Sequence, residues 1–150
     1  MNIQQKIVII SAEKTGAKDL DQVARTDRLR GMLNQMHYSH GVFSGFTSAT
    51  RVHNGKNEDV FIVKLKDSEW ENELEVLQGY AKNFGQDAIF FSDANRNTEL
   101  LFTNGSSEGL GRLISITKEE AKDTASYFVR QHKIAGKVAN TYYYTTRKVQ

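Results

Sequence analysis

Six apolar runs in the chain have the composition of β-strands. The first, KIVIISAE from Lys6 to Glu13, is rich in β-branched residues and predicts a central strand that is buried on both faces. A second run spans residues 42–55 and contains Gly45, which favours a bulge at that point. The remaining runs predict further strands at residues 59–66, 87–93, 98–105 and 112–116.

Two segments with apolar residues at helical spacing separate these strands. The first predicts a helix from Asp19, a suitable N-cap, to Met36. The second predicts a helix that is capped by Asp67 or Ser68 and ends at Gly85. The apolar face of this second helix consists of Trp70, Leu74, Leu77, Ala81 and Phe84.

The last third of the chain is less regular. The segment SSEGLG, residues 106–111, contains two glycines and predicts a turn between strands. Thr117 and Glu120 match a capping box, so residues 117–133 are expected to form a third helix. The C-terminal YYYTTRKVQ places three tyrosines in a row, which suits a strand that packs on a neighbour in the same or another chain.

This order of elements indicates one α+β domain over residues 1–150. It reads β-α-β-β-α-β, followed by a hairpin and a helix, which is a ferredoxin-like core with an added hairpin and C-terminal helix. Right-handed crossovers are expected to place the first two helices on one face of the sheet. The third helix or another subunit would then cover the other face.

Composition excludes several classes of protein. The chain has no Cys, so disulfides and thiolate chemistry are ruled out, and its four His lack the spacing of a zinc site. A net charge of +2, with no basic cluster beyond Arg147 and Lys148, argues against a nucleic-acid partner. With no long apolar run and no signal-peptide pattern, we expect no membrane contact and a cytoplasmic protein.

Three features are candidates for chemistry. The connection from Ser11 to Asp19 follows the buried strand but carries no phosphate-binding glycine pattern, so a plain loop is the simpler interpretation. The SSEGLG segment could approach a ligand, although a turn is the simpler interpretation. The adjacent acids Glu58 and Asp59 stand where an apolar strand begins, and they are either a solvated edge or a cation-binding site.

Taken in order, several segments of the chain resemble those of one known family. They are a strand that ends in SAE, a helix containing VARTDRLRGML, the strand GVFSGF, the acidic strand NEDVFIVKLKD, a helix with a Trp, and QDAIFFSD before a hairpin. In this order they resemble the bacteriophage S-adenosylmethionine lyases, also described as S-adenosylmethionine hydrolases. The resemblance covers about residues 6–116.

The resemblance implies a fold, an activity and an assembly. It implies a ferredoxin-like core in PII-like trimers, with the substrate bound between subunits of the homo-oligomer. It also implies cleavage of S-adenosylmethionine to methylthioadenosine and homoserine lactone without a cofactor or metal. Depletion of the host pool would protect phage DNA from restriction systems that need S-adenosylmethionine, so the protein would act in the host cytoplasm.

The resemblance also implies one essential residue. The family's glutamate ahead of the third strand falls on Glu58 by register, and its family role is to engage the substrate's amino group. Family members place a tyrosine upstream of this glutamate, whereas GFTSATRVHNG has none. Other residues expected to line the pocket are Ser11, Arg25, Ser44 and Phe46.

Two of these candidates also have another explanation. Arg25 could form an ion pair on the helix surface, and Phe46 could belong to the core. At the level of the whole protein, a PII-like nucleotide-binding or protein-interaction module without catalysis stays open, because a fold does not fix a function. A ferredoxin-like RNA binder is a further alternative, although the strand with Phe90 and Phe91 lacks the basic-aromatic pattern of such modules.

Overall fold

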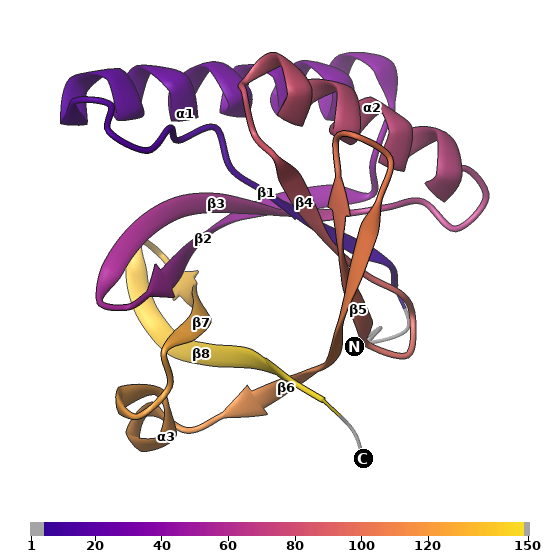
Figure 1. The fold of residues 1–150 in the computed structure, drawn as a ribbon. Coiled ribbons are helices and arrows are strands. Elements are labelled where there is room, and N and C mark those ends of the chain that lie inside the picture. The colour runs from indigo at the N-terminus through magenta and orange to yellow at the C-terminus, as the bar shows by residue number, and fades with distance from the viewer. Residues whose placement is uncertain (1–4, 149–150) are drawn as a thin grey trace.

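The chain folds into a closed antiparallel β-barrel with two long helices on its outside (Figure 1). The computed structural model describes residues 5–148. Around the barrel the eight strands follow the order β1-β3-β2-β7-β8-β6-β5-β4. The elements are β1 (Ile7–Ile10), α1 (Asp19–Asn34), the π-helical turn η1 (Gln35–Ser39), β2 (Gly45–His53), β3 (Lys56–Lys64), α2 (Trp70–Asn83), β4 (Ala88–Ser92), β5 (Asn97–Phe102), β6 (Ser107–Ile116), α3 (Lys118–Lys122), β7 (Ser126–Ile134) and β8 (Lys137–Arg147).

Strand β1 is central and buried on both faces, as its unbroken β-branched run predicts. It pairs with β3 on one side and β4 on the other. All four of its residues are buried. Because side chains alternate along a strand, Val8 and Ile10 face the helices, whereas Ile9 faces the barrel interior.

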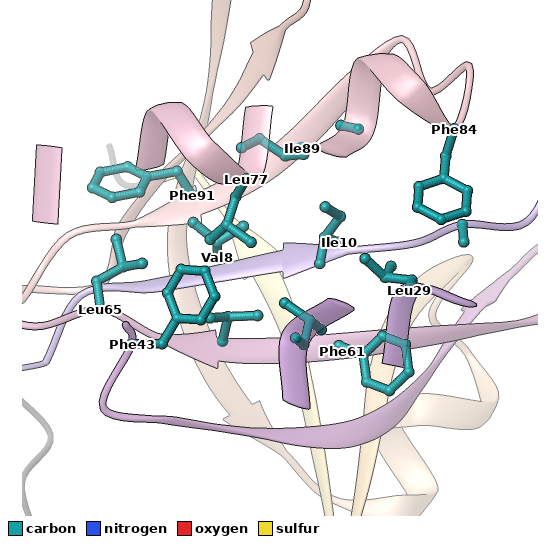
Figure 2. Packing of buried hydrophobic residues seen from close by; sticks show 14 residues of the cluster. Val8, Ile10, Leu29, Phe43, Phe61, Leu65, Leu77, Phe84, Ile89 and Phe91 are labelled. Atoms are coloured by element: carbon teal, nitrogen blue, oxygen red, sulfur yellow. The ribbon is translucent and has the colours of Figure 1, made fainter. Parts of the chain in front are cut away.

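Helices α1 and α2 cover the outer side of the sheet formed by β1, β3 and β4 (Figure 1). Leu29 of α1 and Leu77 of α2 are fully buried against Ile10, Phe61 and other residues of these strands (Figure 2). The predicted end of the second helix is confirmed, since α2 ends before Gly85, which has a φ of +72°. This two-layer packing fixes the position of the connections that leave β1 and β3.

The predicted ferredoxin-like sheet is wrong, because the sheet does not stay open. Beyond β4 the chain adds four more strands, and β7 pairs with β2, so the barrel closes. The inner face is covered by these strands rather than by a third helix or a second subunit. Phe128 of β7 packs there on Ile9, Val60 and Phe90, with the Phe90 and Phe128 rings 5.2 Å apart.

The predicted third helix is also wrong beyond its first turn. The capping box is present: the Thr117 hydroxyl accepts a hydrogen bond from the Glu120 amide, and the Glu120 carboxylate accepts one from the Thr117 amide. However, α3 ends at Lys122, and the following SYFVRQHKI forms β7. Residues 126–129 are rich in aromatic and β-branched side chains, and a short helix gains too little to extend through them.

Four smaller predictions need correction. The SSEGLG segment is not a turn: most of it is the first half of β6. Strand β2 is not bulged at Gly45, because its register with β3 is unbroken from Gly45 to His53. The N-cap positions are Lys18 for α1 and Glu69 for α2, and neither makes a side-chain capping bond. Helix α1 ends at Asn34 rather than Met36, and η1 continues the helical path.

A buried glutamate, Glu73, forms hydrogen bonds with the segment that precedes β2 and with the segment that precedes α2. Glu73 is 3% exposed, and its two carboxylate oxygens accept hydrogen bonds from the amides of Phe43 (3.0 Å) and Lys66 (2.8 Å). Phe43 is buried and has a φ of +65°, which is uncommon for a residue with a side chain. Glu73 therefore stabilises an otherwise unfavourable backbone conformation just before β2.

Candidate active site

Glu58 lies in β3 directly opposite Arg51 of β2. Its carboxylate Oε1 is 3.6 Å from the Arg51 guanidinium, and the two side chains are 29% and 38% exposed. Such a partly solvated pair is weak, typically below about 1 kcal/mol. Glu58 can therefore exchange Arg51 for another cation at little cost.

Glu13 is a second carboxylate beside Glu58 and Asp59. It follows β1, and its Oε2 accepts a hydrogen bond from the Asp59 amide. Its own backbone is fixed as well, because its amide donates to the Ser11 hydroxyl at 3.0 Å and its carbonyl accepts from Gln86. Glu13 therefore ties the end of β1 to the acidic pair in β3.

The surroundings of Glu13 favour its neutral form. Burial raises the pKa of Glu13 above its ordinary value, and the hydrogen bond from the Asp59 amide offsets part of this rise. The negative charges of Asp59 and Glu58 raise the pKa further. Three carboxyl groups thus stand close together, and Arg51 is the basic side chain that forms an ion pair with one of them among residues 5–148.

The two acids of the pair face opposite sides of the sheet. Glu58 shares its side with Val60, which packs in the barrel interior, whereas Asp59 shares the side of Phe61. Asp59 contributes to a cleft of about 580 Å³ between β2 and β7. The ladder joining these strands covers only residues 50–53 of β2, and the cleft opens where the strands separate.

Arg25 lies on α1 near this site, and it forms no ion pair with any residue from 5 to 148. Its guanidinium donates to the carbonyls of Ala12, at 2.6 Å, and Phe84, and it lies over the Phe84 ring. Arg25 thereby connects the end of β1 to the end of α2. Together with Ser11, it holds the backbone on the N-terminal side of Glu13.

Ser44 and Phe46 lie at the other end of β3 from Glu58. The Ser44 amide donates to the Lys64 carbonyl, and Phe46 is paired with Val63. Phe46 packs against the core under the helices and makes an edge-on contact with Phe61. The structure therefore brings Ser11 and Arg25 towards the acidic pair but keeps Ser44 and Phe46 apart from it.

Sequence reasoning missed Glu13 and Arg51 as members of the site. Glu13 was visible as the last letter of the SAE motif, and the end of a buried strand is a common position for functional groups. Arg51 gave no such signal, because its place opposite Glu58 depends on the register between β2 and β3. Residues 5–148 contain no group of three or more His, Asp or Glu that could hold a metal ion.

The comparison with known protein families gives one match. The family model described as the S-adenosylmethionine lyase family matches residues 8–146, which is nearly the whole chain. No curated protein matches the chain. The matched segment includes Ser11, Glu13, Arg51, Glu58 and Asp59.

Proposed function

We propose a mechanism and a role for this chain, which belongs to the S-adenosylmethionine lyase family and is therefore an enzyme that breaks a carbon–sulfur bond of S-adenosylmethionine. In this mechanism the substrate's own carboxylate attacks its γ-carbon. An oxygen–carbon bond forms as the carbon–sulfur bond breaks, and the electron pair of the broken bond goes to sulfur. The products are homoserine lactone and methylthioadenosine, and no proton or co-reactant is needed.

The chemistry explains why the enzyme needs few catalytic groups. A sulfonium is already a good leaving group, so no acid has to activate it. The step neutralises a carboxylate and a sulfonium, and it therefore proceeds faster where water is excluded. The main task left to the protein is to hold the methionine chain in a folded conformation that brings the carboxylate to the γ-carbon.

We assign this task to Glu58, which would hold the ammonium group of the substrate. The observation that supports the assignment is the imbalance of charge: the negative charges of Glu58 and Asp59 both act on Glu13, and Arg51 contacts Glu58 only loosely. A charge-assisted bond to the ammonium group would displace Arg51 and leave the substrate carboxylate free to attack. Ser11 and Arg25 would act indirectly, by fixing the backbone that carries Glu13.

The proposed grip on the ammonium group has a direct test. We compare S-adenosylmethionine with an analogue that lacks the amino group, using the wild type and Glu58→Gln. A charge-assisted hydrogen bond contributes about 1.5–3 kcal/mol, so the wild type should lose about 10- to 150-fold in kcat/KM with the analogue. The variant should lose much less. Equal losses in both proteins would show that Glu58 does not contact the amino group.

The lactone mechanism is tested by the products of a reaction in ¹⁸O-labelled water. Attack by the substrate carboxylate gives unlabelled homoserine lactone in samples quenched early, and later ring opening places the label in the carboxyl group. Direct hydrolysis at the γ-carbon would instead place the label in the hydroxyl group of homoserine. That second pattern would refute the intramolecular attack.

As the biological role of the enzyme, we propose that it depletes the S-adenosylmethionine pool of a host cell and so protects phage DNA from restriction. The supporting argument is that restriction systems that depend on this compound fail when it is scarce. Expression in a restricting host should lower the pool and raise the plating efficiency of unmodified phage. An inactive variant should change neither quantity. If restriction is relieved without loss of the pool, the proposed role is wrong.

The proposal includes assembly into a homo-oligomer, a trimer with its active sites between subunits. The partial exposure of Glu58 and Arg51 supports it, because a neighbouring subunit would remove both from water. Light scattering on the eluted protein should give about three times the chain mass of 17.0 kDa.

For the part of the chain from residue 5 to residue 148, no helix is long and apolar enough to cross a membrane.

A further inference from the structure

The hairpin formed by β7 and β8 projects beyond the barrel. Every residue from Gln131 to Asn140 is exposed, although the two strands are paired along this length. Its tip carries Ile134, which is 63% exposed, and Val138, which is 50% exposed. Two-stranded hairpins without further packing are only marginally stable in water, and exposed apolar groups are typical of contact surfaces. The tip therefore has the character of a surface that another protein covers.

The register of the hairpin shows how such a contact would be made. Ile134 is paired with Lys137, and Lys133 is paired with Val138. Paired residues point to the same side, and adjacent residues point to opposite sides. Each side of the tip therefore presents one apolar residue and one lysine, and a partner would need to accept both kinds of side chain.

The charge of this region specifies the partner further. Residues 126–150 contain no Asp or Glu. The same residues contain five Lys or Arg. Lys133 and Lys137 lie at the tip and Arg130 lies further down β7, whereas Arg147 and Lys148 lie at the other end of β8. A surface of this kind is complementary to an acidic one, which would guide association and fix its orientation.

The chain itself carries a suitable acidic surface at the start of α2. Residues 67–81 contain five acids and no Lys or Arg. Glu73 is buried, whereas the other four, Asp67, Glu69, Glu71 and Glu75, are exposed. The partly buried apolar side chains Trp70, Leu74 and Val76 lie among them. In Figure 1, this end of α2 lies on the opposite side of the barrel from β7 and β8, so a hairpin can reach it only in another copy.

We propose that the β7–β8 hairpin tip of one copy docks on the acidic start of α2 in a second copy of this chain. Lys133 and Lys137 would pair with Glu71 and Glu75, and the apolar tip would cover the apolar groups between them. Because the two surfaces differ, the contact is head-to-tail, and repetition closes a ring or extends a filament. This inference rests on the proposed oligomer and names the surfaces that form it, but it does not depend on the role of Glu58.

Charge reversal tests the contact. The pair Lys133→Glu and Lys137→Glu should convert the oligomer to a species of one chain mass, 17.0 kDa, in light scattering. Adding Glu71→Lys and Glu75→Lys to the same chain should restore the oligomer, because the charges are then exchanged. The matched control, Lys82→Glu with Lys118→Glu, makes the same change in net charge at two other exposed lysines and should leave the mass unaltered.

Engineered cysteines give a second, independent readout. Since the chain has no cysteine, Val138→Cys and Glu71→Cys in separate preparations can form a disulfide only between copies. Mixing the two should give a cross-linked dimer, whereas Val138→Cys mixed with Lys82→Cys should not. A wild type that stays monomeric overturns both the oligomer and this contact. An oligomer that survives the Lys133 and Lys137 reversal, or recruitment of a different acidic protein instead, overturns this contact alone.

Discussion

Removal of the buried Glu73 carboxylate should cause one of the largest losses of stability available to a single substitution in this protein. In Glu73→Ala, the amides of Phe43 and Lys66 both lose their acceptor. Neither amide can regain water freely, because Glu73 and Phe43 are buried and the contact with Lys66 is partly buried. The positive φ of Phe43 then loses the bond that offsets its conformational cost.

The size of the effect follows from the two lost bonds. A hydrogen bond to a charged group contributes about 1.5–3 kcal/mol, so the loss of two should lower the free energy of unfolding by about 3–6 kcal/mol. Glu73→Gln keeps one acceptor oxygen and should lose about half of that amount. Glu75→Ala, an exposed change two residues further along α2, should stay within about 0.5 kcal/mol of the wild type.

Urea unfolding followed by circular dichroism measures these differences. All variants should share one slope against urea, and the midpoints should rank as wild type and Glu75→Ala, then Glu73→Gln, then Glu73→Ala. The titrations are repeated at several protein concentrations, since association adds to apparent stability. A Glu73→Ala variant within about 1 kcal/mol of the wild type would refute the reasoning, because the two amides would then have found other partners.

Three further predictions concern other parts of the fold. Gly111→Ala should abolish cooperative unfolding or lower the midpoint strongly, because Gly111 has a φ of +91° and an added Cβ would collide with the Arg147 backbone of β8; a near-native midpoint would contradict this. The free energy of unfolding of Glu13→Gln should equal that of the wild type at low pH and exceed it above pH 4.5, because the raised pKa of Glu13 means that its stabilising effect is lost as pH rises. If the variant is instead less stable than the wild type at neutral pH, the bond from the Asp59 amide to the charged form of Glu13 outweighs the cost of burial. Glu120→Ala should lower stability at neutral pH, and the difference should disappear as pH falls below 4.5, because the hydrogen bonds of the cap lower the pKa of Glu120; a difference that persists at pH 2 would contradict it.

The N-terminal half of the fold could be predicted from local pattern. The unbroken run at β1 and the apolar stripe of α2 predict elements whose burial the structure confirms. These signals are strong because β1 is buried on both faces, which gives an unbroken apolar run, and α2 buries one face, which gives an apolar stripe. The capping box at Thr117 was also correct, but a cap specifies where a helix starts and not how far it continues.

The closure of the barrel could not be predicted in the same way. It depends on the pairing of β2 with β7, which are more than 70 residues apart, and on Phe128 filling the interior. The sequence of β7 mixes charged, aromatic and β-branched residues, so a helical spacing could be fitted to it. Tertiary contacts, rather than local preference, decide its conformation.

The candidate site was predictable only in part, for a related reason. The acidic pair in β3 stands out in the sequence, whereas its neighbours come from other strands and connections. Glu13 reaches Asp59 across 46 positions, and Arg51 reaches Glu58 only through the register of the β2–β3 hairpin. Conversely, Phe46 packs against the core, which is the simpler of the two explanations that its sequence position allows.

The most direct measurement is the turnover of S-adenosylmethionine by the wild type, Glu58→Gln and the control Glu108→Gln, which changes an exposed glutamate on β6. We predict that methylthioadenosine forms at equal rates with the wild type and the control, and that kcat/KM falls by about 10- to 150-fold in Glu58→Gln, as expected for the loss of one charge-assisted bond. Full activity in folded Glu58→Gln would contradict the central claim. Glu58 would then be a partly solvated strand residue whose carboxylate only pairs with Arg51.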